Sequence, residues 1–183
     1  MSIKRLNPMM ILVLIVFSFT QFTFAKSANL INAEVTAAVK KFEREVAGGS
    51  KFLSRVKGYL VFPSVIKGGF VLGAEYGEGA LRVDGATKYF YSMTSASLGW
   101  QIGVQKHTVV IAFLSDAALN NFINSDGWEA GVDGSITLVD WGKSKDITSI
   151  SYEKPIIAFV YGETGLMAGV SIEGTKFQRI IPN

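Results

Sequence analysis

Apolar residues recur every three to four positions from about Ala28 to Ala47, with charged residues between them. This period is that of an amphipathic helix, so we predict a helix over this segment. Its apolar positions are Ile31, Val35, Val39, Phe42 and Val46. Gly48-Gly49-Ser50 then ends the helix and can begin a short second one, which carries Phe52, Leu53 and Val56 and stops at Lys57-Gly58.

After Gly58 the pattern changes to the two-residue alternation of β-strands. Strands are predicted at 59–62, where Pro63 would end the strand, and at 69–76, 80–83 and 87–91, with a hairpin turn at Asp84-Gly85. The clearest alternation runs from Ser95 to Gln105 and predicts one strand. A turn at Lys106-His107 would lead into 108–114, an apolar run typical of a strand buried on both faces.

The last third of the chain predicts one more helix and further strands. Ser115-Asp116 can begin a helix through Asn124 whose buried side carries Ala118, Leu119 and Phe122. Strands are predicted at 131–139 and 155–161, the latter forming a hairpin with 167–177, whereas 140–153 is a loop or a weak edge strand. We therefore expect an α+β fold: a curved, mainly antiparallel, glycine-rich sheet or partly closed barrel, with N-terminal amphipathic helices packed against it.

Glycines spaced four apart, as in Gly69, Gly73 and Gly77, fall on one face of a strand, where they allow bending or close approach of another backbone. A curved sheet is the simpler interpretation. The sharper one is a small polar groove beside the glycines that could hold a lipid head group or a peptide. Gly77-Glu78-Gly79 has neither the lysine nor the context of a phosphate-binding loop. The candidate groove residues are Ser95, Ser97, Gln101 and Gln105.

The first 25 residues have the order of a secretory signal peptide: Lys4 and Arg5, an apolar run, and small residues ending at Ala25. We predict cleavage after Ala25, with an uncleaved membrane anchor as the alternative. Residues 26–183 then form one domain, because no repeat or linker divides them. Removal of Lys4 and Arg5 lowers the net charge from +3 to +1, which does not describe a nucleic-acid-binding protein.

The usual catalytic and metal-binding patterns are not found in the sequence. There is no cysteine, and the one histidine, His107, is expected in a solvated turn without a metal set around it. The acidic residues Asp126, Glu129 and Asp133 do not keep the spacing of a calcium loop, although weak cation binding stays open. Serines 92, 95 and 97 lack a nucleophile-elbow context. We expect no catalytic residue, no cofactor and no metal, and hence not an enzyme.

Three segments resemble the SYLF domain family, also called the Ysc84-like family. They are 57–70 (KGYLVFPSVIKGGF), 95–105 (SASLGWQIGVQ) and 160–174 (VYGETGLMAGVSIEG). The resemblance implies a lipid-binding module. In eukaryotic members an amphipathic N-terminal helix recognises phosphoinositides, and some members bind actin. The equivalent part here is 28–57, whose basic residues could face anionic head groups at about 1 kcal/mol each. These residues are Lys40, Lys41, Arg44, Lys51, Arg55 and Lys57.

The chain departs from the eukaryotic members because it has an export signal and no SH3 or FYVE domain. It therefore resembles a stand-alone bacterial envelope protein, periplasmic or secreted and peripherally associated with a membrane. We expect it to bind anionic phospholipid at a membrane surface through its basic helical region. The alternative is a structural or protein-interaction module with an envelope protein partner, in which the helix simply covers the sheet.

Overall fold

A computed structural model describes residues 26–69, 72–98, 103–139, 147, 154–162, 165–166 and 171–183. The predicted signal peptide lies outside these residues, as does most of 140–153. The helices are α2 (Ala28–Glu45), α3 (Gly49–Leu53) and α4 (Asp116–Asn124). The strands are β1 (Gly58–Gly69), β2 (Leu72–Val83), β3 (Ala86–Leu98), β4 (Gly103–Phe113), β5 (Trp128–Glu129), β6 (Thr137–Leu138), β7 (Ile156–Gly162), β8 (Gly165–Leu166) and β9 (Lys176–Ile180).

All three predicted helices are present, and local signals explain their bounds. The Ser27 hydroxyl accepts a hydrogen bond from the Leu30 N–H and caps α2, and Ser115 caps α4 through the Ala118 N–H. Gly48, with φ of 79°, turns the chain from α2 into α3. The predicted apolar stripe of α2 is its buried face.

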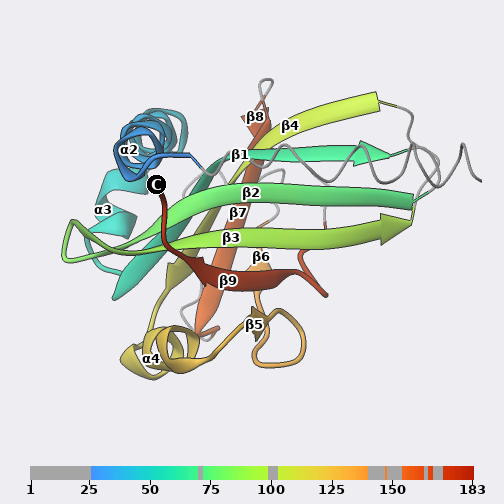
Figure 1. Cartoon of the computed structure of the whole chain (residues 1–183). Coiled ribbons are helices and arrows are strands. Elements are labelled where there is room, and N and C mark those ends of the chain that lie inside the picture. Colours follow the sequence, from blue (N-terminus) through green and yellow to red (C-terminus); the bar gives the residue numbers. More distant parts are fainter. Residues whose placement is uncertain are drawn as a thin grey trace, which may run out of the picture.

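The described strands form a single curled sheet, which confirms the predicted α+β fold. Its strand order is β5-β9-β3-β2-β1-β4-β7-β6, with β8 paired to β7. All pairings are antiparallel except that of β6 with β7, so the sheet is mixed. Figure 1 shows α2 and α3 on one side of the sheet and α4 with β5 on the other, forming a half-barrel rather than a closed one.

Two predicted strand ends are wrong because β1 and β2 are longer than expected. Pro63 does not end β1; it lies in an irregularity between Phe62 and Val65, where a residue without an N–H is tolerated. β2 joins 72–76 of one predicted strand to the strand predicted at 80–83, so Gly77-Glu78-Gly79 is strand, whereas Gly69 ends β1. The turn at Asp84-Gly85 is confirmed, and both residues have positive φ, as a tight hairpin turn requires.

The single strand predicted from Ser95 to Gln105 is wrong. β3 ends at Leu98 and β4 begins at Gly103, and in the sheet β2 and β1 lie between them. Both strands direct their odd-numbered residues to the same face, so the alternation shows no break where one strand gives way to another. The turn predicted at Lys106-His107 is also wrong, because both residues lie inside β4.

The turn of the predicted C-terminal hairpin is present, because β8 pairs in antiparallel fashion with β7, whereas 167–170 lie outside the described residues. The last part of the predicted return strand has a different partner. The described strand that follows Gly174, β9, pairs with β3 rather than with β7, and the partner of β7 on that side is the two-residue β8. Of the strand predicted at 131–139, only Thr137–Leu138 is strand, paired in parallel with β7, and Gly134 forms an isolated bridge with Ala130. In the sheet β3, β2, β1 and β4 lie between β9 and β7, and the local pattern does not encode this strand order.

Each face of the sheet has its own apolar core. On the α2 side, Phe42 and Phe52 pack edge-on against Phe159 of β7, with ring centroids 5.0 and 5.6 Å apart. On the α4 side, Phe122 packs against Phe113 and Tyr91. Within the described part of the chain, no helix combines the length and apolar character needed to cross a membrane.

Candidate functional site

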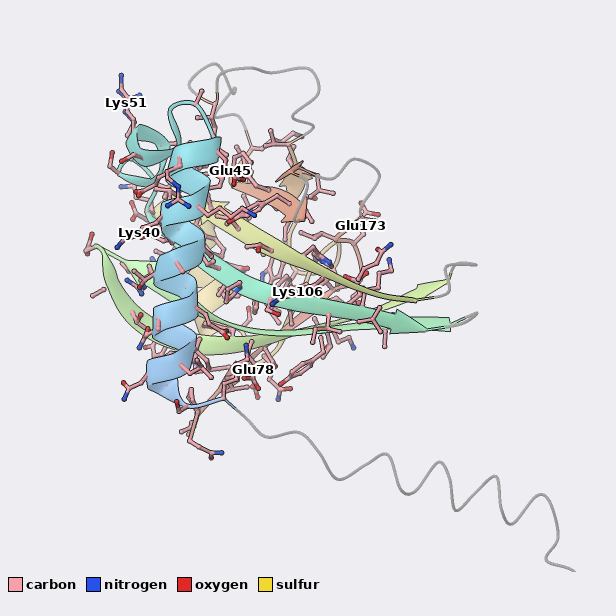
Figure 2. All side chains as sticks on the ribbon, turned by 90° about the horizontal axis from the view of Figure 1, so that it is seen from above. Lys40, Glu45, Lys51, Glu78, Lys106 and Glu173 are labelled. Carbon is pink, nitrogen blue, oxygen red and sulfur yellow. The ribbon has the colours of Figure 1, made fainter. Side chains whose placement is uncertain are left out.

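Four of the six predicted lipid-binding residues are exposed basic side chains around α2 and α3. We call Lys40, Arg44, Lys51 and Arg55 the basic helical surface. Lys40 and Arg44 are one turn apart on α2, opposite its buried stripe, because successive residues are 100° apart around a helix. Figure 2 shows Lys40 and Lys51 projecting on the side away from the strands. Among the described residues, none of the four forms an ion pair.

The other two predicted residues have partners. Lys41 lies on the flank of α2, where its Nζ is 3.9 Å from Glu45 and 5.5 Å from the centre of the Tyr161 ring. Lys57 forms an ion pair of 3.0 Å with Asp116 at the start of α4. Lys57 therefore lies beside the start of α4. The six predicted residues thus do not form a single exposed basic surface.

A cavity of about 340 Å³ lies on the Lys41 flank of α2, between the helix and strands β1, β4 and β7. Its lining includes Lys41, the exposed Lys106, Thr108 and Tyr161. The Tyr161 hydroxyl donates to the Ala38 carbonyl at 3.1 Å, which ties the helix to the sheet. Burial, together with the Glu45 charge, raises the pKa of Tyr161 to about 12, so the phenol stays neutral.

The candidate groove residues are not neighbours along one strand. Ser95 is half-buried in β3 and Gln105 is exposed in β4, while Ser97 lies in β3 opposite Gly73. Gln101 lies outside the described residues. Across the sheet the register places Glu75 of β2 and Lys67 of β1 between Ser95 and Gln105. The row predicted as a small polar groove therefore has two charged residues at its centre.

Glu75, Lys67 and His107 form a charged cluster on the α4 side of the sheet. Glu75 and His107 are 7% and 5% exposed. One Glu75 oxygen is 3.0 Å from Lys67 Nζ, and the other is 3.6 Å from His107 Nε2. Burial lowers the pKa of His107 below its ordinary value, while Glu75 acts to raise it and Lys67 to lower it. His107 is thus a buried neutral imidazole at neutral pH, not the solvated turn residue expected.

Sequence reasoning missed this cluster because its members come from three strands. From the sequence, position 75 falls in the strand predicted at 69–76 and His107 in a predicted turn. The alternation of side chains could have indicated the contact only if the strand order had been known. His107 and Gln105 are two positions apart in β4 and so face the same side of the sheet, and Glu75 pairs with Ser95.

The acidic residues considered for calcium are used locally. An Asp133 carboxylate oxygen accepts from the Glu129 N–H at 2.7 Å, and Glu129 pairs with Lys176. In the part of the chain that the structure describes, no three histidine, aspartate or glutamate residues gather as a metal site.

Comparison with known families bears on the C-terminal half of this architecture. The profile of a family described as Ysc84, Las17-binding protein actin regulator, matches residues 94–179, from the end of β3 into β9. This match supports the resemblance to the Ysc84 (SYLF) family over residues 94–179. No curated protein matches the sequence. The match to the Ysc84 family supports a lipid- or actin-related domain at most. The basic helical surface lies outside the matched residues, so its role is a property of this chain's own geometry.

Proposed function

We propose that the protein is a non-catalytic domain that binds anionic phospholipid head groups, phosphoinositides included, at a membrane surface through the basic helical surface. The observation that carries the proposal is the placement of Lys40, Arg44, Lys51 and Arg55: all exposed and free of ion pairs among the described residues. Exposed cations that are not held in ion pairs attract an anionic membrane at about 1 kcal/mol each. As part of this proposal, export by the predicted signal peptide would bring this surface to a membrane of the cell envelope.

The packing of α2 makes it a rigid platform for this contact. Phe42 and the Tyr161 hydroxyl hold the helix against β7 from below, so its outer face keeps Lys40 and Arg44 in water without rearrangement. Lys41 and Lys106 flank the adjoining cavity, where a head-group phosphate could reach both cations. The basic helical surface would supply attraction to the membrane, and the cavity would supply a contact for a single head group.

Vesicle flotation tests the proposal. The protein is mixed at low salt with vesicles of phosphatidylcholine alone, of phosphatidylcholine with phosphatidylglycerol, or of phosphatidylcholine with a phosphatidylinositol phosphate. We expect binding only to the anionic vesicles. Lys40→Gln with Arg44→Gln removes two cations, or about 2 kcal/mol, so apparent affinity should fall roughly 30-fold.

The matched control is Lys154→Gln with Lys176→Gln, which makes the same change in charge on residues that belong to neither α2 nor α3. This control should keep most of the affinity. Equal losses in the two double variants would show that net charge and not the basic helical surface is responsible. Absence of binding to every anionic vesicle would refute the proposal.

A second candidate function, a protein-interaction module, is favoured by exposed apolar side chains on the α2 side of the sheet. Ile66 and Val104 are 52% and 77% exposed, and Ile66 pairs with Tyr76 across β1 and β2. If an envelope protein binds there, Ile66→Ser with Val104→Ser will abolish its capture, while Lys40→Gln with Arg44→Gln will not. The lipid proposal expects Lys40→Gln with Arg44→Gln to weaken vesicle binding more than Ile66→Ser with Val104→Ser.

A further inference from the structure

Glu78 of β2 is a buried carboxylate, 6% exposed, that faces the start of α2 (Figure 2). One of its oxygens accepts a hydrogen bond of 3.1 Å from the backbone nitrogen of Lys26, and the other accepts one of 2.8 Å from the Tyr76 hydroxyl. Among the described residues, no basic side chain forms an ion pair with Glu78. A buried carboxylate that has only neutral donors is costly, because its lost hydration is not offset by an opposite charge.

Lys26 is the residue that follows the predicted cleavage site. Hydrolysis of the Ala25–Lys26 bond adds the hydroxyl of water to the Ala25 carbonyl and leaves an amine on Lys26. At neutral pH this amine takes a proton and becomes an ammonium group. We propose that cleavage after Ala25 creates an α-ammonium group that forms an ion pair with Glu78 and fixes the new N-terminus to β2. The proposal rests on the predicted cleavage and is independent of lipid binding.

The surroundings of Lys26 fit a docked N-terminus. Its side-chain Nζ is already paired with Glu34, so Glu78 is left to the backbone nitrogen. The Ala28 N–H donates to the Asn183 carbonyl, which brings the last residue of the sequence alongside the same end of α2, as Figure 1 also shows. Burial and the bond to Glu78 raise the pKa of Tyr76 to about 12, so its hydroxyl keeps donating through the neutral range.

Two electrostatic effects compete at this position. The N-terminus of α2 carries partial positive charge, which favours Glu78 but acts against a nearby ammonium group. Glu78 is in direct contact and favours the ammonium form, with Glu34 adding a second negative charge close by. Direct contact with a buried carboxylate is the stronger effect, because a charge-assisted hydrogen bond is about twice as strong as a neutral one. We expect the pKa of the new α-amino group to lie above its ordinary range.

The first experiment identifies the processed end. The full chain is produced in a bacterial host that exports it, and the exported protein is examined by intact mass and N-terminal sequencing. The expected product begins at Lys26. A product that begins elsewhere, or that keeps residues 1–25, overturns the proposal, because Glu78 then faces an amide nitrogen.

The second experiment tests the ion pair in the exported protein. The rate at which an acylating reagent modifies the α-amine is followed by mass spectrometry across pH. In the unaltered protein the rate should rise with a midpoint above the ordinary pKa of roughly 7.7–8.0. Glu78→Gln should make the α-amine about tenfold more reactive at neutral pH, which corresponds to one pKa unit. Glu34→Gln is the control, because it removes the partner of the Lys26 side chain and leaves Glu78 in place.

The stability of the exported protein gives an independent readout. A cation with a raised pKa stabilises the folded state below the unfolded pKa, and this contribution is lost as pH rises through the folded pKa. The free energy of unfolding should therefore fall between roughly pH 8 and pH 10 in the unaltered protein and less so in Glu78→Gln. An ordinary midpoint for the α-amine in the unaltered protein contradicts the proposal even if Glu78→Gln does not fold.

Discussion

At the scale of the residue, His107 shows how a tertiary contact changes the chemistry of a side chain. It lies in β4 beside Glu75 and Lys67, and burial holds its pKa below the ordinary value. In the unfolded chain it takes up a proton near pH 6.5, but in the folded protein it does so only at lower pH. The unfolded state therefore binds more protons as the pH falls through 6.5, and the free energy of unfolding decreases.

We predict that His107→Gln removes this part of the acid sensitivity. Denaturant unfolding from pH 7.5 to pH 5 should show the unaltered protein losing stability more steeply than the variant. Lys51→Gln serves as a comparison, because this exposed lysine belongs to α3 and not to the Glu75 cluster, and lysine does not titrate in this range. Parallel pH profiles for the unaltered protein and His107→Gln would mean that the imidazole is protonated equally easily in both states.

At the scale of the element, glycine permits the irregular pairing of β1 with β2. A Cβ atom on Gly79 would lie 2.1 Å from the Val61 carbonyl oxygen and 2.8 Å from the Phe62 ring, next to the shift in register between Val61 and Val65. The prediction that strand glycines allow close backbone approach is therefore confirmed at Gly79. At Gly68, by contrast, nothing lies within 4 Å of an added Cβ.

Gly79→Ala should thus force the two backbones apart and lower the free energy of unfolding by about 1–3 kcal/mol or more. Gly68→Ala makes the same chemical change and should stay within about 0.5 kcal/mol. Urea unfolding measures both, with the change read from the midpoint at constant slope. Similar losses at the two positions would show that backbone freedom, not close approach, sets the requirement for glycine.

At the scale of the whole molecule, one sheet joins two apolar cores. Phe42 of α2 packs on Phe159 of β7, and Phe122 of α4 packs on Phe113 of β4. β4 and β7 are neighbouring strands, but the two contacts lie on opposite faces of the sheet. The prediction of one domain over residues 26–183 requires these cores to unfold together, because each strand of the central sheet contributes side chains to both.

Phe42→Ala and Phe122→Ala should each cost about 3–5 kcal/mol and should shift the same transition. Far-ultraviolet and near-ultraviolet circular dichroism should give coincident unfolding curves in both variants. Because the two rings share no partner, their effects should add within about 0.5 kcal/mol in the double variant. If Phe42→Ala lost its far-ultraviolet helical signal before its near-ultraviolet tertiary signal, the chain would unfold as two units, which contradicts the prediction of one domain.

The sequence by itself determined the features that depend on near neighbours. The amphipathic period, the Ser27 and Ser115 caps and the Asp84-Gly85 turn each involve residues a few positions apart, so α2, α4 and the β2–β3 hairpin were predictable. The strand alternation also indicated a mainly antiparallel sheet, and the glycines indicated its curvature. The helical period correctly assigned the basic residues of α2 to positions outside its apolar stripe.

Only the tertiary structure decided which distant residues meet. Alternation repeats identically in consecutive strands, so it could not reveal that β3 and β4 are separated by two strands or that β9 pairs with β3. For the same reason it could not place His107 against Glu75 or set Glu78 against Lys26, 52 positions away. Nor could it show that Lys57 has an ion pair while Lys40 has none among the described residues. These contacts follow from strand order and curl, which are set by burial over the whole sheet and not by any local pattern.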